Sequence, residues 1–461
     1  MTALSIDNLK KKFLNLTKEF LFENIATRRS STWRLWWLTV AAIFTACYLV
    51  YGLILVGIPE LSGGASKFAL ASFVWAILGF VTGTATLRPV LILPMMFFAI
   101  TVISGFTLQT YPIDHIGKIS TVWLGAISIG FFLMNGVSVR IIIAGLLVTF
   151  VANMVAISVG YEGYQIVTQE QSIEEVAIGE VRRSSGLAGQ SNLLLLLCFT
   201  LPFAVCLLER KVNILIYLTL AGVCIATTVL TGSRSGIVLS VLFIVFGGLF
   251  LLKNGWAKFF FIFVGIIGAI FAVEFVISPD ALSKIHYSAL GDIVIVQRTI
   301  EGLEGVDNSA DTRNEIVSDS WQYYAEKPLL GYGPDMFREV VGQGFYAHNN
   351  FVEIGINWGI VGQISYYLCY LAILIGMFKR HRVILLTPLL FLIIADLWFV
   401  LFLERPAVLL LCAMLAVSSA PVPHRSGISK RKRRSKRKRR SRDKIRKKSR
   451  MATRNSSNLI R

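Results

Sequence analysis

Long apolar segments separated by short polar ones dominate the hydropathy pattern of the chain. Most of them hold about 17–23 residues, and a helix of that length crosses the ~30 Å hydrocarbon core of a bilayer. The pattern therefore predicts an all-α, polytopic membrane protein with about twelve transmembrane helices. The predicted spans are residues 35–57, 68–86, 89–106, 119–135, 138–160, 192–208, 213–231, 236–252, 257–278, 350–378, 383–402 and 405–421.

Two connecting segments, 161–191 and 279–349, are much longer than the others. The second contains DTRNEIVSDSWQYYAEKP, in which Asp311 is a candidate N-cap and Pro328 closes the segment. Its apolar positions recur at helical spacing: Ile316, Val317, Trp321 and Tyr324. We therefore expect an amphipathic helix within a long structured loop between the ninth and tenth spans. Connections of this length are usually functional.

Composition agrees with a membrane protein and excludes an ordinary soluble globule, since 55% of the residues are hydrophobic and only 16% are charged. The six cysteines all lie in apolar segments and none has zinc-ligand spacing. No cluster of His, Asp and Glu shows metal-ligand spacing, and there is no P-loop or dinucleotide-binding motif. We therefore expect neither a metal nor a cofactor.

The formal net charge of +19 is concentrated in the C-terminal tail, residues 425–461. That tail holds nineteen of the 46 Lys and Arg residues and only one acid, Asp443. Such basic blocks are disordered and bind polyanions, and anionic lipid headgroups are the nearest ones beside a final span. The tail has neither the interleaved aromatic residues nor the fold that would indicate nucleic-acid binding.

Basic residues in short loops indicate the cytoplasmic side of a membrane protein. Placing the basic N-terminal arm, residues 1–34, in the cytoplasm also places the other basic short loops and the tail there. Both termini are then cytoplasmic, and both long loops lie on the outer side. The chain is thus expected to comprise this arm, a transmembrane domain over 35–424 and the tail.

Several arginines break this rule because they lie on the predicted outer side, among them Arg183, Arg234 and Arg313. Arg234 lies in TGSRSG, between two spans that almost no loop separates. A guanidinium held there costs free energy unless it is paired or faces water, and a bound phosphate would remove that cost. The alternative is snorkelling to lipid headgroups, or pairing with Glu274 or Glu353.

The segment GFYAHNNFVEIGINWGIVG, residues 344–362, starts a span with a histidine, His348. On a continuous helix, which turns about 100° per residue, Gly355, Gly359 and Gly362 would lie within about 40° of its direction. Small residues on one face allow a second helix to approach closely. The spacing therefore predicts a clamped helix that fixes the imidazole, as a catalytic group requires. The alternative is an interfacial histidine above an ordinary packing stripe.

Together these segments resemble the O-antigen ligase and O-antigen polymerase superfamily of bacterial membrane glycan transferases. That family's pattern of His, then Asn, Ser or Gln, nine residues, Gly, two residues, and Gly, Thr or Tyr is met in full from His348-Asn349 to Gly359 and Gly362. RSSGLAGQSN is similar to the family's Arg-x-x-Gly stretch, although Ser191 stands where Pro is frequent. TGSRSG and residues 311–337 resemble two further family segments, so the likeness covers 180–375 in order.

The resemblance implies a glycosyltransferase of cell-surface polysaccharide synthesis in the bacterial inner membrane, acting on the outer, periplasmic face without a metal. It implies transfer of a glycan from a polyprenyl pyrophosphate to a hydroxyl, on lipid A–core for a ligase or on another lipid-linked glycan for a polymerase. Protein O-glycosylation is a third possibility. By position in the motifs, His348 would activate the hydroxyl, supported by Asn349, Gly359 and Gly362. Three arginines would hold the pyrophosphate: Arg183, Arg234 and Arg313.

Two other classes of protein stay open from the residues alone. A transporter or flippase of lipid-linked glycans would also need arginines for pyrophosphate, but would carry charges along a path through the membrane. The candidates here gather at the outer edge, with Asp396 as the clearest exception. The other alternative is a non-catalytic membrane scaffold whose working part is the polyanion-binding tail.

Overall fold

The computed structural model describes residues 21, 32–54, 63–108, 112–160, 187, 191–208, 211–265, 309–341 and 346–420. Every regular element in these ranges is helical, and Val212 and Leu252 form an isolated β-bridge. The predicted all-α class is thus confirmed for the described residues. Met1–Ser419 form one unit and Ala420–Arg461 a second. The predicted tail, 425–461, lies outside the described residues.

Eight helices of the described chain are long and apolar enough to cross a membrane, which supports the polytopic class. They are Thr32–Ile54 (α2, Thr32–Leu49, with η2, Val50–Ile54), Gly64–Val81 (α4), Pro89–Leu108 (η4, Pro89–Leu91, with α5, Ile92–Leu108), Ile116–Asn135 within α6 (Pro112–Asn135), Val139–Ser158 (α7), Ser191–Leu208 (α9, Ser191–Val205, with η6, Cys206–Leu208), Ile214–Thr231 (α10) and Asn350–Lys379 (α18).

Four further apolar helices have 10–17 residues within the described part of the chain. They are Ser235–Leu251 (α11, Arg234–Leu242, with η7, Phe243–Gly247, and α12, Gly248–Leu251), Gly255–Gly265, Val383–Ala395 (η8, Val383–Leu385, with α19, Leu386–Ala395) and Arg405–Ser419 (α20). Each predicted span therefore coincides at least partly with an apolar helix. The number twelve stays a prediction, since eight helices of the described residues meet the length and composition of a span.

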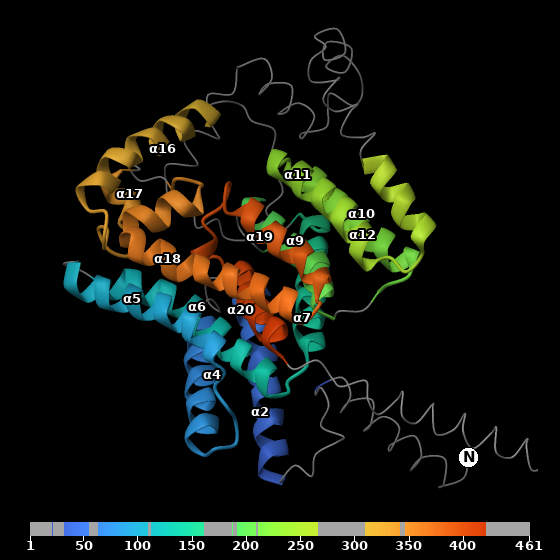
Figure 1. Cartoon of the computed structure of the whole chain (residues 1–461), viewed down its shortest axis with the longest axis horizontal. Coiled ribbons are helices and arrows are strands. Elements are labelled where there is room, and N and C mark those ends of the chain that lie inside the picture. Colours follow the sequence, from blue (N-terminus) through green and yellow to red (C-terminus); the bar gives the residue numbers. More distant parts are fainter. Residues whose placement is uncertain are drawn as a thin grey trace, which may run out of the picture. The chain divides into compact units, whose positions relative to one another are not determined.

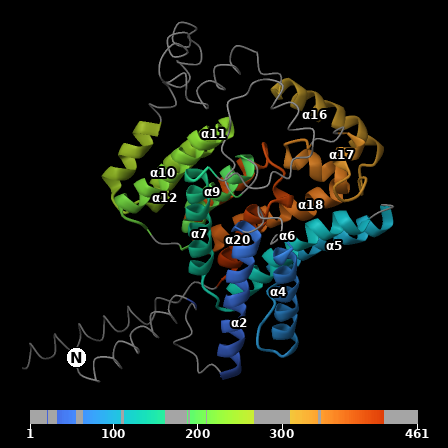
Figure 2. The same ribbon diagram turned by 180° about the vertical axis from the view of Figure 1, so that it is seen from behind.

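The helix α20 lies at the centre of the Met1–Ser419 unit. It packs against α6, α18 and α9, and all its residues from Pro406 to Ser418 are buried. Figures 1 and 2 show it, in red, surrounded by these helices. By contrast α4, α7 and α10 leave large apolar side chains such as Val74, Val151 and Leu215 exposed. Exposed apolar helix faces of this kind are the surface that lipid chains solvate.

Basic side chains donate hydrogen bonds to carbonyl groups at one end of the membrane helices. Arg88 donates from Nη1 to the Ser419 carbonyl, 2.9 Å, and from Nη2 to the Met134 carbonyl, 3.3 Å, and Arg382 donates to the Val417 carbonyl. Carbonyls at helix C-termini have no partner within their own helix and carry partial negative charge, so guanidinium groups stabilise them. The C-terminal ends of α6 and α20 thus meet at this end, which the charge rule assigns to the cytoplasm.

The long loop contains the helix expected in it. The helix α16 runs from Ser309 to Glu326, and a short helix α17, Phe337–Val340, follows it before α18. The predicted N-cap at Asp311 is wrong, because the helix begins two residues earlier and Asp311 lies inside it. Pro328 does lie just beyond the end, where a missing N–H cannot break a helical hydrogen bond.

Candidate functional site

His348 lies just before α18 and not on it. Its backbone has φ +50°, the left-handed region, where histidine is found more often than most residues with a side chain. The helix begins at Asn350, and the Asn349 side chain caps it by accepting a hydrogen bond from Val352 N at 3.1 Å. The expectation that His348 continues one helical face through the glycines is therefore wrong.

A break in α18 at Gly359 is a second reason why His348 and the three glycines do not lie on one helical face. This residue has φ +60° and ψ −161°, a combination open almost only to glycine, so the helix consists of two halves. Beyond the break, Ile360 N donates to the Pro328 carbonyl at 2.8 Å and Val361 N to the Leu329 carbonyl at 3.3 Å. The loop after α16 thus supplies acceptors for the first amides of the second half.

The same loop also satisfies the end of the first half. Tyr332 N donates to the Ile356 carbonyl at 2.9 Å, and Gly333 N to the Asn357 carbonyl at 2.8 Å. Backbone groups inside a membrane protein must find partners, and residues 328–333 provide them on both sides of the break. A Cβ on residue 359 would lie 2.6 Å from the Pro328 carbonyl oxygen. Because Gly359 has no side chain, the backbone of a loop can pack directly against it. The sequence had predicted a second helix in that place.

Two buried amide side chains hold the broken helix together. Gln363 donates from Nε2 to the Phe351 carbonyl at 3.0 Å, which links the two halves, and accepts from Tyr324 Oη of α16 at 3.2 Å. Asn357 accepts from Phe337 N of α17 at 2.8 Å. Both helices of the long loop are thus fastened to α18, close to the segment that carries His348.

Hydrogen bonds also hold the residues on either side of His348. Ala347 N donates to Oε2 of Glu353 at 3.2 Å, and this carboxyl group is fully buried. Asn350 N donates to the Asp396 carbonyl at 2.7 Å, and its side-chain oxygen accepts from Phe402 N at 3.1 Å. The histidine segment is therefore anchored both to the first turn of α18 and to the segment between α19 and α20.

Tyr346, two residues before His348, lies between two cations. The Nζ of Lys118 in α6 donates to its hydroxyl at 3.1 Å, and the guanidinium carbon of Arg338 in α17 lies 4.9 Å from the ring centroid. Such cation–π contacts fix a ring in place. Burial raises the pKa of the Tyr346 phenol, although Lys118 opposes the shift, so the phenol stays neutral near pH 7.

A further pair of charged residues lies where α20 begins. Burial raises the pKa of Glu404 to about 7, and the positive charges of Lys118 and Arg405 work against this shift. Arg405 donates from Nη1 to the Gly52 carbonyl in the middle of η2, 3.3 Å away. The ends of α6, α18 and α20, together with the short helix α17, thus bring together five groups that we call the charged cluster: Lys118, Arg338, Tyr346, Glu353 and Glu404.

Reasoning from sequence named Glu353 only as a possible partner of an arginine and did not bring the charged cluster together. Lys118 precedes a predicted span by one residue, Glu353 lies in the first turn of another, and Glu404 occupies a two-residue loop. Each is a single charge at the predicted outer edge of a span, which is the signal that could have found it.

The structure gives partial information on the three predicted arginines. Arg183 lies outside the described residues. Arg234 is the first residue of α11, just after Gly232 ends α10 with φ +58°, and Arg313 lies in α16. Their side chains are not among those described, so convergence on one pyrophosphate stays a prediction. Among the described residues no group of three or more His, Cys, Asp and Glu could hold a metal ion.

Residues 218–367 match the family model described as O-antigen ligase. The matched region begins in α10 and ends in the second half of α18, so it contains Arg234, Arg313, His348 and the break at Gly359. Arg183, Lys118 and Glu404 lie outside it. A comparison with curated proteins finds no match.

Proposed function

We propose that this chain, which the match of residues 218–367 places in the O-antigen ligase superfamily, is a membrane glycosyltransferase. In this proposal it transfers a glycan from a polyprenyl pyrophosphate to an acceptor hydroxyl. The observation that carries the proposal is the anchoring of His348. Hydrogen bonds through Ala347 and Asn350 fix the segment around it, and the break in α18 attaches the long loop beside it. A group that accepts a proton in the transition state needs such a fixed position.

In the proposed reaction the acceptor hydroxyl attacks the anomeric carbon of the donor sugar and gives its proton to His348. The bond between that carbon and the pyrophosphate oxygen breaks, and the pyrophosphate leaves with the electron pair. A single attack inverts the configuration at the anomeric carbon. Arg183, Arg234 and Arg313 would stabilise the charge that develops on the leaving group, which is the main catalytic task when that group is already good. Guanidinium groups perform it without a metal.

We further propose that the reaction takes place on the outer, periplasmic face of the bacterial inner membrane. His348 and the charged cluster lie where α6 and α20 begin, at the opposite helix ends from Arg88 and Arg382. Because the positive-inside rule assigns the loops of those two arginines to the cytoplasm, His348 faces outward. Donor glycans would be presented there, with lipid A–core or another lipid-linked glycan as acceptor.

The test is a transfer assay with the full-length protein in lipid nanodiscs, a polyprenyl-pyrophosphate glycan, an acceptor glycan and no nucleotide. A new glycosidic bond in the product supports the proposal. Movement of the donor across a vesicle membrane without bond transfer would instead identify a transporter. His348→Ala should lower the rate by about 10²–10⁴-fold, the usual contribution of a general base.

His381→Ala is a matched control, because His381 also has a positive φ, +54°, but lies beyond the other end of α18. Normal transfer by a correctly folded His348→Ala variant would remove this histidine from the mechanism. At each predicted arginine, substitution by Ala should cost about 10–150-fold. Lys should restore only part of that loss, because an ammonium keeps the charge but not the bidentate geometry. Full rescue by Lys would favour snorkelling to lipid headgroups.

A further inference from the structure

Two loops that carry lysines meet at the predicted cytoplasmic side. One contains Lys211 and leads into α10, and the other joins α12 to the helix Gly255–Gly265. The bridge between Val212 and Leu252 ties them together, with Val212 N donating to the Leu251 carbonyl at 2.9 Å. Because η8 contacts both α12 and η6, the basic segment 379–382 that precedes η8 lies on the same side.

The backbone of these loops holds two ammonium groups close together. The bridge places Lys211, the neighbour of Val212, beside the loop that leads to Lys258. Contact with Lys258, partial burial and the repulsion between the two charges lower the pKa of Lys211. The Asn213 side chain accepts from Ile216 N at 2.9 Å and the Asn254 side chain from Trp256 N at 3.0 Å, so both loops are fixed. Two cations kept in contact are stabilised when an anion lies between them.

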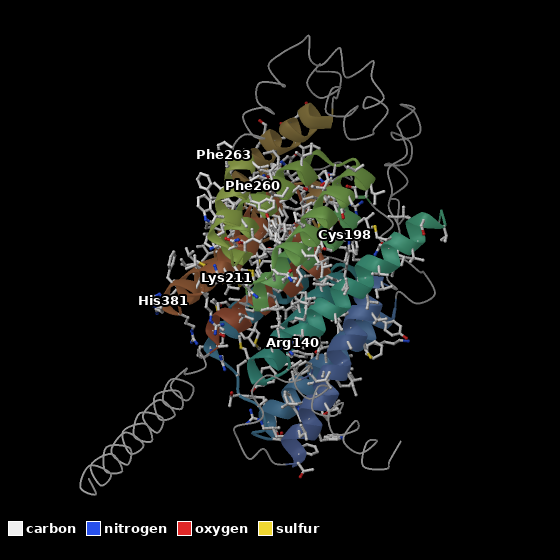
Figure 3. The ribbon with its side chains drawn as sticks, turned by 90° about the vertical axis from the view of Figure 1, so that its right-hand side faces the viewer. Arg140, Cys198, Lys211, Phe260, Phe263 and His381 are labelled. Atoms are coloured by element: carbon white, nitrogen blue, oxygen red, sulfur yellow. The ribbon has the colours of Figure 1, made fainter. Side chains whose placement is uncertain are left out.

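Exposed aromatic rings continue from the lysines along the helix Gly255–Gly265. Trp256 is 82% exposed, and Phe259, Phe260 and Phe263 also expose more than half of their surface. Figure 3 shows Phe263 projecting from the edge of the helices, with Phe260 close to it. Tryptophan gathers at the level of lipid headgroups, and phenylalanine faces extend into the hydrocarbon. We therefore expect Lys211, Lys253 and Lys258 at the level of the lipid headgroups.

We propose that Lys211 and Lys258 bind the phosphate of an anionic phospholipid headgroup in the cytoplasmic leaflet, with Lys253 adding charge at the rim and Trp256 contacting the lipid. The phosphate oxygens accept hydrogen bonds from both ammonium groups and replace their repulsion with attraction. This site is separate from the basic tail and from the transferase chemistry. Each lysine should contribute about 5-fold in affinity, so the pair contributes roughly 30-fold.

The experiment measures quenching of Trp256 by brominated phosphatidylglycerol and, in parallel, by brominated phosphatidylcholine, using full-length protein in detergent. Subtracting the signal of a Trp256→Phe variant isolates this ring from the other tryptophans. The charge variant is Lys211→Gln with Lys258→Gln. The matched control is Lys67→Gln, an exposed lysine near the start of α4. All variants keep the tail, so its contribution is the same throughout.

The expected result is stronger quenching by phosphatidylglycerol than by phosphatidylcholine, weakened roughly 30-fold in the double variant and unchanged in the Lys67 control. A double Lys→Arg variant should bind as the natural protein does, which separates lost charge from lost folding. Equal quenching by the two lipids overturns the proposal, as does undiminished phosphatidylglycerol binding by the double variant. Displacement of the lipid by inorganic phosphate at an equal concentration would show a free-phosphate site instead.

Discussion

Replacing Gly359 by alanine tests the broken helix most directly. The backbone at this position has φ +60° and ψ −161°, which costs about 1–3 kcal/mol for a residue with a side chain. The new methyl group would also lie 2.6 Å from the Pro328 carbonyl oxygen. This neighbour is backbone, so it cannot rotate away as a side chain could. The loop would have to move.

Displacing that loop removes the hydrogen bonds from Ile360 N to Pro328 and from Val361 N to Leu329. Each such bond contributes about 0.5–1.5 kcal/mol. Together with the backbone strain, we expect Gly359→Ala to lower the free energy of unfolding by about 2–6 kcal/mol. Transfer activity should fall as well, because the loop that packs against Gly359, residues 328–333, is joined to the His348 segment through α17 and α18.

The assay is denaturant-induced unfolding of the full-length protein in detergent micelles, followed by tryptophan fluorescence, together with the glycan-transfer assay. Gly222→Ala is the matched control, since Gly222 is exposed in α10 and a Cβ there would meet nothing within 4 Å. Its stability should be unchanged or up to about 1 kcal/mol higher. If Gly359→Ala were as stable as this control, residue 359 would be able to adopt a helical backbone, and the reasoning from the break would be refuted.

Three further predictions concern buried charge and the tail. Glu353→Ala should lower the free energy of unfolding by about 1–3 kcal/mol, because it leaves Ala347 N without its acceptor; Glu353→Gln should cost less, and equal losses in a denaturation experiment would contradict that account. Because folding raises the pKa of Glu404 from 4.5 to about 7, the folded protein binds more protons between these values, so this residue favours folding most below pH 4.5 and loses that effect as pH rises through 7. Glu404→Gln should flatten the fall of the melting temperature between pH 5 and 8, and an unchanged slope would exclude this carboxyl group as its source. Deleting 425–461 should leave transfer in detergent intact, because the tail is assigned to the side opposite His348; lost turnover with unchanged protein amount and fold would show another role for the tail.

Much of the architecture follows from local pattern. Apolar segments of membrane length identify the helices, since each satisfies its own backbone hydrogen bonds and needs only a run of apolar residues. The same local logic identifies α16, whose apolar residues repeat at helical spacing. Four motif segments between 180 and 375 together indicated the O-antigen ligase and polymerase superfamily, and the match of residues 218–367 to the O-antigen ligase family model supports this.

The tertiary structure alone decided how that motif is built. A glycine such as Gly359 suits a close helix contact and a helix break equally well, and the choice depends on whether residues 328–333 supply partners for the freed backbone groups. The same applies to the contact between Lys118 and Tyr346, which lie 228 residues apart in the chain. The residues next to Lys118 or Tyr346 in the sequence give no indication of this contact, because it forms only when distant helix ends pack together. Local hydrogen bonding therefore determines where the helices lie, and packing between them determines where His348 is held.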